Sequence, residues 1–310
     1  MTIQKSQIQL DANESVFFNR QLESIKRKTY DVKQKQLKAF ALVPVSTDAD
    51  PGAEQITYRS FTQMGMAKFG SDYMTDSPRA GVYGTEVKRA VHAVRDHYAY
   101  SIQEIRRAAM AGTDLVAREA IAARRAVDEK VNAVAFLGNT DTNTPGFLNN
   151  PNTTVYAVPN DGTGTTKTWS TKSADLIIRD IGGLVNSVVA ATNGRELPDT
   201  LLLPITQYNY IANTPRSTNS DVTILQYILK NNPYLKTIEW LPELTGIGSG
   251  STDRMLCYVK DEDHLTLEIP QPFEQFPPQQ RNLAFFVECH MRTGGTILYY
   301  PASVAVGDGI

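Results

Sequence analysis

The residues best suited to metal binding or acid–base catalysis are the four histidines, His92, His97, His264 and His290. None of them lies in an HExxH motif or four residues from another histidine, the spacings that place two ligands on one face of a helix. Cys289 and His290 are adjacent in a segment with the pattern of a β-strand, where neighbouring side chains point to opposite faces. We therefore expect these residues to occupy ordinary positions in strands, and we expect no metal site.

Two glycine-rich segments have the composition of nucleotide-binding loops. Residues 162–168 combine glycine, threonine and lysine, but their spacing differs from GxxxxGK[ST] and no apolar strand precedes them. Residues 246–250 lack the strand–turn–helix context of a dinucleotide site. The acidic run 261–263 is typical of a turn between strands. Neither a GxSxG motif nor a cysteine-nucleophile motif occurs, so the sequence gives no argument for an enzyme.

The bulk composition is typical of an ordered globular chain, with 41% hydrophobic and 21% charged residues. No stretch approaches roughly 18 uncharged apolar residues, and the N-terminus lacks the apolar run of a secretory signal, so we expect no membrane segment. Cys257 and Cys289 predict buried thiols in a reducing compartment. The net charge of −2 gives no global case for nucleic-acid binding.

The charge is uneven near the N-terminus. Between positions 20 and 38 only Glu23 and Asp31 oppose a series of cations: Arg20, Lys26, Arg27, Lys28, Lys33, Lys35 and Lys38. This pattern fits either a solvated helix face or a basic arm that meets an acidic neighbour or packaged nucleic acid. Residues 1–50 show weak periodicity, which predicts an arm that needs a partner to become ordered.

Residues 55–98 have the alternation of two β-strands separated by a loop rich in glycine and proline. This pattern predicts an extended hairpin. Its alternation is only partly apolar, and a two-stranded hairpin that cannot bury a face within its own chain is marginally stable. The hairpin is therefore expected to need a partner.

A long alanine-rich helix is predicted over residues 113–137, about 24 residues or roughly 36 Å. A capping box from Ser101 to Glu104 starts the preceding helix, and Gly112 is placed to end it. Gly138 ends the long helix and begins an unusual loop, residues 138–151. The helix carries no catalytic signature, and its small side chains suit close packing against a sheet.

The second half of the chain alternates between strand and helix patterns, which predicts a compact α/β subdomain. Helices are expected from residue 173, over 207–212 and over 222–230. Strands are expected at 200–203, 236–240, 254–260 and 264–269. Residues 270–280 are predicted to be a proline-rich connection, followed by two closing β segments at 283–292 and 296–301.

Two local patterns carry a resemblance to a known family. The long helix is followed by Thr144-Pro145-Gly146-Phe147-Leu148-Asn149, and the C-terminal part contains Arg292-Thr293-Gly294-Gly295 and then Tyr300-Pro301-Ala302. Together with the order of arm, hairpin, long helix, α/β subdomain and returning strands, the chain resembles the Hong Kong 97-type major capsid protein of tailed bacteriophages over nearly its whole length.

The resemblance implies an α+β fold of the Hong Kong 97 type. Its parts would be an N-terminal arm (1–50), an extended loop (51–98), a peripheral domain (99–173 and 281–310) with a spine helix (113–137), and an axial domain (174–280). Many copies would form pentamers and hexamers of an icosahedral shell that encloses the phage genome. The shell would be found in the virion, after assembly in the bacterial host cytoplasm.

The resemblance implies no catalytic residue, cofactor or metal, and no membrane. Portal, scaffolding or decoration proteins could be further partners, and double-stranded DNA would be packaged non-specifically. Candidate inter-subunit contacts are the cations of the arm and of the hairpin face: Arg20, Lys26, Arg27, Lys28, Lys68, Arg79, Lys88, Arg89 and Arg95. We expect that a chain lacking residues 1–40 stays soluble but fails to close shells.

Two alternatives remain open at the level of the sequence. One is an encapsulin, a bacterial nanocompartment shell of the same fold that holds a cargo enzyme. The other is a soluble α+β enzyme or binding protein. Particle size separates the shell-forming classes from the last, and nucleic acid inside the particles separates a virus from a nanocompartment.

Overall fold

The computed structural model describes residues 32–69, 78–217, 219 and 221–310. Contacts divide the chain into Met1–Gln36 and Leu37–Ile310, and all the elements below belong to the second part.

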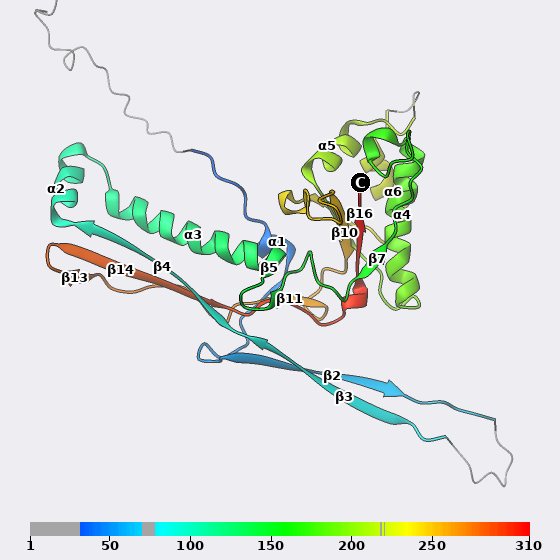
Figure 1. Ribbon diagram of the computed structural model, residues 1–310, viewed down its shortest axis with the longest axis horizontal. Helices are drawn as coiled ribbons and strands as arrows, with labels where there is room; N and C mark the ends of the chain where they lie inside the picture. Colours follow the sequence, from blue (N-terminus) through cyan, green and yellow to red (C-terminus); the bar gives the residue numbers. More distant parts are fainter. Residues whose placement is uncertain (1–31, 70–77, 218, 220) are drawn as a thin grey trace, which may run out of the picture. The chain divides into compact units, whose positions relative to one another are not determined.

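A long helix lies along a sheet of long antiparallel strands (Figure 1). Helix α3 (Leu115–Leu137) contacts two strands that pair with each other over ten residues, from His92↔Thr293 to Ser101↔Ala284. The strands of this sheet are β4 (His92–Ser101), β12 (Gln271–Gln275), β13 (Gln279–Arg281) and β14 (Ala284–Thr293).

The alanine-rich face of α3 explains this close packing. Ala123 is buried against Tyr98, Val287 and Cys289 of the sheet, and a small side chain lets helix and sheet approach each other. In the second half of the helix, Val131 contributes to a different and larger core. The helix predicted from the sequence is therefore confirmed as a structural element that joins two packed regions.

The helix ends follow the predicted local chemistry. Helix α2 (Ile102–Ala111) starts with the Ser101–Glu104 capping box and ends at Gly112, whose φ of 66° is left-handed. Asp114 then caps α3 by accepting a hydrogen bond from the Ala117 amide at 3.1 Å. The side chains of Ser101 and Asp114 satisfy amides that the first turn of each helix leaves free.

The loop after α3 closes the C-terminal end of that helix. It contains the paired strands β5 (Gly138–Asn139) and β6 (Thr144–Pro145). The amides of Phe147 and Leu148 then donate to the carbonyls of the last helical turn, at 2.9 Å each. Both side chains are fully buried, so the loop inserts apolar residues into the core as it leaves the helix.

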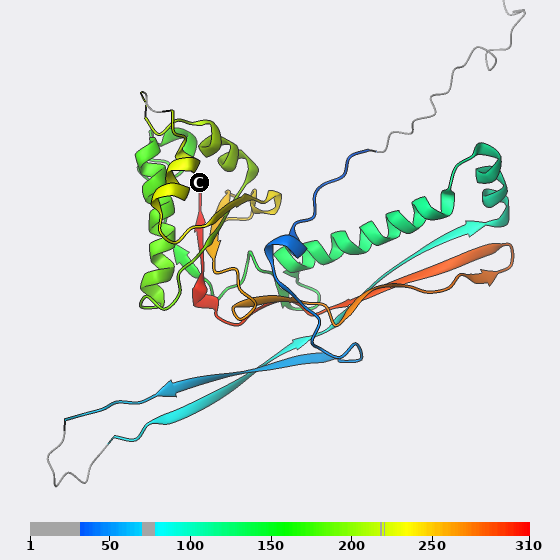
Figure 2. The same ribbon diagram turned by 180° about the vertical axis from the view of Figure 1, so that it is seen from behind.

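A mixed α/β region follows, and its sheet includes strands from outside residues 174–280. A five-stranded mixed sheet has the order β7-β16-β10-β8-β9. The strands are β7 (Thr154–Tyr156), β8 (Thr200–Leu203), β9 (Thr237–Trp240), β10 (Arg254–Tyr258) and β16 (Val304–Asp308). Helices α4 (Ala174–Ala191), α5 (Ile205–Asn213) and α6 (Ile224–Asn231) lie in the same region as this sheet (Figure 2). Buried apolar residues join them to the sheet.

A small sheet ties the start of the second part to its C-terminal strands. Its order is β1-β11-β15, with β1 (Val45–Ser46), β11 (Leu265–Glu268) and β15 (Gly295–Leu298). Helix α1 (Ala39–Leu42) precedes it, with Ala39 fully buried. Residues 39–46 therefore pack within their own chain, although the sequence predicts over residues 1–50 one arm that depends on a partner.

The hairpin is formed by β2 (Gln55–Met64) and β3 (Gly81–Ala90), paired antiparallel along their whole length. The sequence pattern predicts a hairpin that continues to residue 98. In the structure the pairing changes at Val91, which is buried and whose amide donates to the Glu54 carbonyl at 2.9 Å. The next residues form β4 and pair with β14 instead, so residues 92–98 belong to the long sheet.

Two further segments differ from the expectation, and a third is buried more deeply than its composition suggests. Residues 270–280, predicted as a connection, contain β12 and β13; Pro272 is tolerated because it lies at a bulge in an edge strand. Strand β16 was not predicted, because its apolar run is short, and it joins the five-stranded sheet beside β10. Trp169 is buried in the core around α4 although its segment, 152–172, has little apolar content.

Candidate inter-subunit surface

Most side chains of the hairpin formed by β2 and β3 are exposed. From Arg59 to Met64 every residue of β2 is exposed, and so is every residue from Val82 to Glu86 of β3. Arg59 and Glu86 form a cross-strand ion pair at 2.9 Å, but both side chains are more than half exposed. Such a pair contributes little to stability.

Both faces of the hairpin carry exposed apolar side chains. Phe61 and Val82 lie on one face and are 68% and 64% exposed. Met64 and Tyr83 lie on the other face and are 60% and 64% exposed. If another sheet of the same chain packed against the hairpin, it could cover only one of these faces. Clusters of exposed apolar side chains mark interaction sites.

The base of the hairpin, in contrast, is fixed to the rest of the chain. The Tyr58 ring meets the Tyr299 ring edge-on, with centroids 5.0 Å apart. Arg292 of β14 donates from its guanidinium to the carbonyl oxygens of Pro51 and Ala53. A Cβ on Gly294 would lie 3.1 Å from Ile56 Cδ1, so the two segments are in close contact. The hairpin is thus anchored at one end and uncovered beyond it.

The candidate cations occupy several different places. Lys68, Arg79 and Lys88 are exposed on or beside the hairpin. Arg89 lies on the opposite face from Lys88 and lines a hollow of about 410 Å³ with the loop that follows α3. Its Nε is buried and has no hydrogen-bond partner among the described residues. The arm residues Arg20, Lys26, Arg27 and Lys28 lie outside the described residues.

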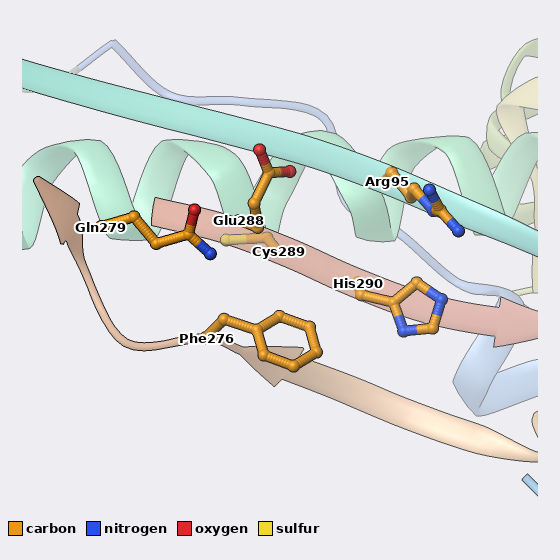
Figure 3. Close-up of a pocket in the computed structure, with 6 residues that line it drawn as sticks. All are labelled: Arg95, Phe276, Gln279, Glu288, Cys289 and His290. Atoms are coloured by element: carbon orange, nitrogen blue, oxygen red, sulfur yellow. The ribbon is translucent and has the colours of Figure 1, made fainter. Parts of the chain in front are cut away.

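Arg95 is not on the hairpin at all. It lies on β4, opposite His290 of β14, and lines a second hollow of about 440 Å³ with Glu288 and Phe276 (Figure 3). Burial and the positive charges of Arg95 and Arg292 lower the pKa of His290, which favours its neutral form. The expected single charged face is therefore not formed, because the strand pairing changes at Val91 and neighbouring strand residues point to opposite faces.

The exposed apolar residues of the hairpin are not among the candidate contacts predicted from the sequence, although the sequence contains a signal for them. In the segment QITYRSFTQM, large apolar side chains occur at both even and odd positions, as Tyr58, Phe61 and Met64 show. A strand that one sheet face covers would keep them at one parity. Apolar residues at both parities in a two-stranded hairpin indicate cover from outside the chain.

The described residues lack a metal-binding cluster, and burial raises the pKa of both cysteine thiols. Residues 32–69, 78–217, 219 and 221–310 contain no group of three or more His, Cys, Asp or Glu arranged to hold a metal. Burial raises the pKa of the Cys257 thiol to about 12, so it does not form a thiolate at neutral pH. Within the same residues no helix is long and apolar enough to cross a membrane.

The fold is that of phage capsid proteins. Solved structures with this fold include the capsid of Myoviridae phage XM1, with a TM-score of 0.84, 19% identity, and coverage of 96% of this chain and 99% of that chain. A Mycobacterium phage Bobi chain matches with a TM-score of 0.64 and 16% identity, covering 93% and 96%. A virus-like particle from Pyrococcus furiosus matches with a TM-score of 0.53 and 11% identity, covering 86% and 90%.

A family model described as "Major capsid protein" matches residues 65–310, and the chain belongs to this family. No curated protein sequence matches the chain. The predicted Hong Kong 97-type fold and the predicted major capsid protein are thereby confirmed, in preference to an encapsulin or a soluble enzyme. The chain is a structural protein of a virion capsid. Many copies of the chain build this capsid.

Proposed function

We propose that this chain assembles through pentamers and hexamers into a closed icosahedral shell around double-stranded DNA. In this shell the hairpin of each copy lies over a neighbouring copy, and the α/β subdomain packs around the five-fold and six-fold axes. The role is geometric and involves no catalysed step. Assembly in the host cytoplasm, with separate portal, scaffolding or decoration proteins, fits a chain of this family.

The observation that carries this proposal is the hairpin, which is anchored at its base and exposes apolar groups on both faces. Removing a large apolar side chain from water stabilises a contact by about 1.5–3 kcal/mol before the cost of association is subtracted. One hairpin therefore gives only a modest affinity. Repeated contacts around a closed shell make the assembly stable although each contact is weak.

The hairpin proposal is tested by polar substitutions on each face in the full chain. One variant carries Phe61→Ser with Val82→Ser, and the other carries Met64→Ser with Tyr83→Ser. Because these side chains are mostly exposed in the subunit, its melting temperature should stay the same. Because they are proposed to be buried in the shell, the protein concentration needed for assembly should rise by about tenfold or more.

The matched control is Ser60→Ala with Thr85→Ala, an exposed polar pair on the same hairpin. Light scattering gives the assembly threshold, and electron microscopy gives the shape of the particles. If both apolar variants assemble like the control, the hairpin does not contribute the inter-subunit contact. If the unmodified chain forms only monomers or dimers under all conditions, shell formation itself is contradicted.

A further inference from the structure

A groove of about 690 Å³ lies between the base of the hairpin and the small β1-β11-β15 sheet. Three carboxylates line it, from Asp48 after β1 and from Glu262 and Asp263 in the turn before β11. All three residues are exposed. Aromatic side chains complete the lining: Tyr58, Phe61, Tyr299 and Tyr300. We call these residues together the acidic groove.

A fourth carboxylate lies beneath this surface. Glu268 is only 3% exposed, and its Oε1 accepts hydrogen bonds from Thr266 Oγ1 at 2.7 Å and from Tyr299 Oη at 3.3 Å. Both donors also line the acidic groove. Glu268 forms no ion pair with a lysine, arginine or histidine in the part of the chain that the structure describes.

The residues that line the acidic groove supply little positive charge. Arg59 is its single basic residue within the described ranges, and its Nε is already engaged by Glu86 at 2.9 Å. The acidic groove therefore repels the phosphates of DNA and attracts cations. Its aromatic rings favour the same occupants, because lysine and arginine side chains stack on the faces of aromatic rings.

We propose that the acidic groove binds the basic segment of a second copy of this chain, residues 20–28. That segment carries Arg20, Lys26, Arg27 and Lys28 against a single acid, Glu23. The inference rests on the proposed shell, which brings copies of the chain together. The acidic groove lies beside the base of the hairpin of its own copy. The basic segment of a second copy would therefore bind next to that hairpin base.

Charge reversal with rescue tests the pairing in the full chain. Glu262→Lys with Asp263→Lys should lower the yield of particles about tenfold or more, because like charges then face each other. Adding Lys26→Glu, Arg27→Glu and Lys28→Glu to the same chain should restore the yield. The matched control, Asp141→Lys with Asp221→Lys, makes the same change of charge at two exposed acids outside the groove and should assemble normally.

Two outcomes would overturn the proposal. The groove variant could assemble as well as the control, or the reversed segment could fail to rescue it while the subunits keep the melting temperature of the unmodified chain. Either outcome leaves the shell itself intact, because the unmodified chain still forms particles. Absence of particles from the unmodified chain would instead contradict the proposed function.

Disulfide trapping distinguishes a second copy from the chain's own segment. One preparation carries Asp263→Cys and the other Arg27→Cys, and the two are mixed before assembly. The native thiols Cys257 and Cys289 are buried, which keeps background cross-linking low. A cross-linked dimer in the mixture supports the proposal. Cross-linking only when both substitutions are on one chain, without dimers, would contradict it.

Discussion

At the scale of residues, two glycines explain the Pro-Gly-Phe-Leu-Asn pattern that follows the long helix. Gly138 has a φ of 74°, and a Cβ on it would lie 2.3 Å from the Thr144 carbonyl oxygen. A Cβ on Gly146 would lie 2.3 Å from the Phe136 carbonyl oxygen. Asn149 completes the closure, because its Nδ2 donates to the Leu137 carbonyl at 2.7 Å. The backbone fits here only without side chains.

Gly146→Ala should destabilise the unassembled subunit by about 3 kcal/mol, because its Cβ would overlap backbone atoms that cannot move independently. Urea unfolding of the subunit measures this loss. The control is Gly182→Ala, where a Cβ meets nothing within 4 Å inside α4. That change should stabilise the helix by about 0.5–1 kcal/mol. Equal stability of the two variants would show that the close approach at Gly146 does not matter.

At the scale of elements, a charge network fixes the segment before α4 to that helix. The Lys172 ammonium, fully buried, contacts Asp180 Oδ2 at 2.6 Å and Asp161 Oδ1 at 3.1 Å. Arg179 also pairs with both aspartates. Hydrogen bonds from Arg179, and then from Lys172, lower the pKa of Asp161 to about 2. The pairing of Lys172 offsets the cost of burying its charge.

This network predicts a pH dependence. The pKa of Asp161 is lower in the folded chain than its ordinary value of 3.8, so its contribution to stability is complete above about pH 4 and is lost as the pH falls toward about 2. Asp161→Asn removes that contribution. The melting temperature of the unmodified subunit should therefore exceed that of the variant at pH 5, and the difference should shrink toward pH 2.

The control for this measurement is Asp141→Asn, an exposed aspartate without an ion pair in the described part of the chain. Its difference from the unmodified subunit should stay small at every pH. A difference for Asp161→Asn that stays constant from pH 5 to pH 2 would contradict the role of its charge.

Local signals allowed many elements to be predicted, whereas pairing partners were not predictable. The capping box at Ser101, the end of α2 at Gly112 and the apolar periodicity of α4 are each encoded within one or two helical turns. The change of partner at Val91 depends on β14, about 200 residues later. Strand β16 is held by its fit to β10, where a Cβ on Gly307 would lie 2.7 Å from Met255 Cε.

The candidate inter-subunit surface was also only partly predictable, because it depends on strand pairing. The cations of the hairpin could be found from the sequence, but their separation onto different faces depends on register. The acidic groove combines Asp48, Glu262 and Tyr299, which come together only through the pairing of β1, β11 and β15. The exposed apolar hairpin residues are the exception, because their mixed parity is visible in the sequence.

At the scale of the whole molecule, Lys38 and Ala39 are fixed to the main core. Asn132 of α3 is 3% exposed, and its Oδ1 accepts hydrogen bonds from the amides of Lys38 and Ala39 at 3.2 and 3.0 Å. The Lys38 ammonium donates to the Trp240 carbonyl at 2.8 Å and lies 3.6 Å from the centroid of the Trp240 ring. The contact boundary after Gln36 agrees with these interactions.

These contacts change what we expect of a chain that lacks residues 1–40. Deleting residues 1–40 would remove Lys38 and Ala39, so the subunit should lose about 2–4 kcal/mol and its melting temperature should fall. Deleting residues 1–36 keeps both residues and should leave the melting temperature unchanged. We expect that this shorter deletion nevertheless prevents shells from closing, because it removes the basic segment proposed to bind a second copy. Calorimetry and electron microscopy of the two truncations separate the effects, and normal particles from the 1–36 deletion would show that closure does not need the arm.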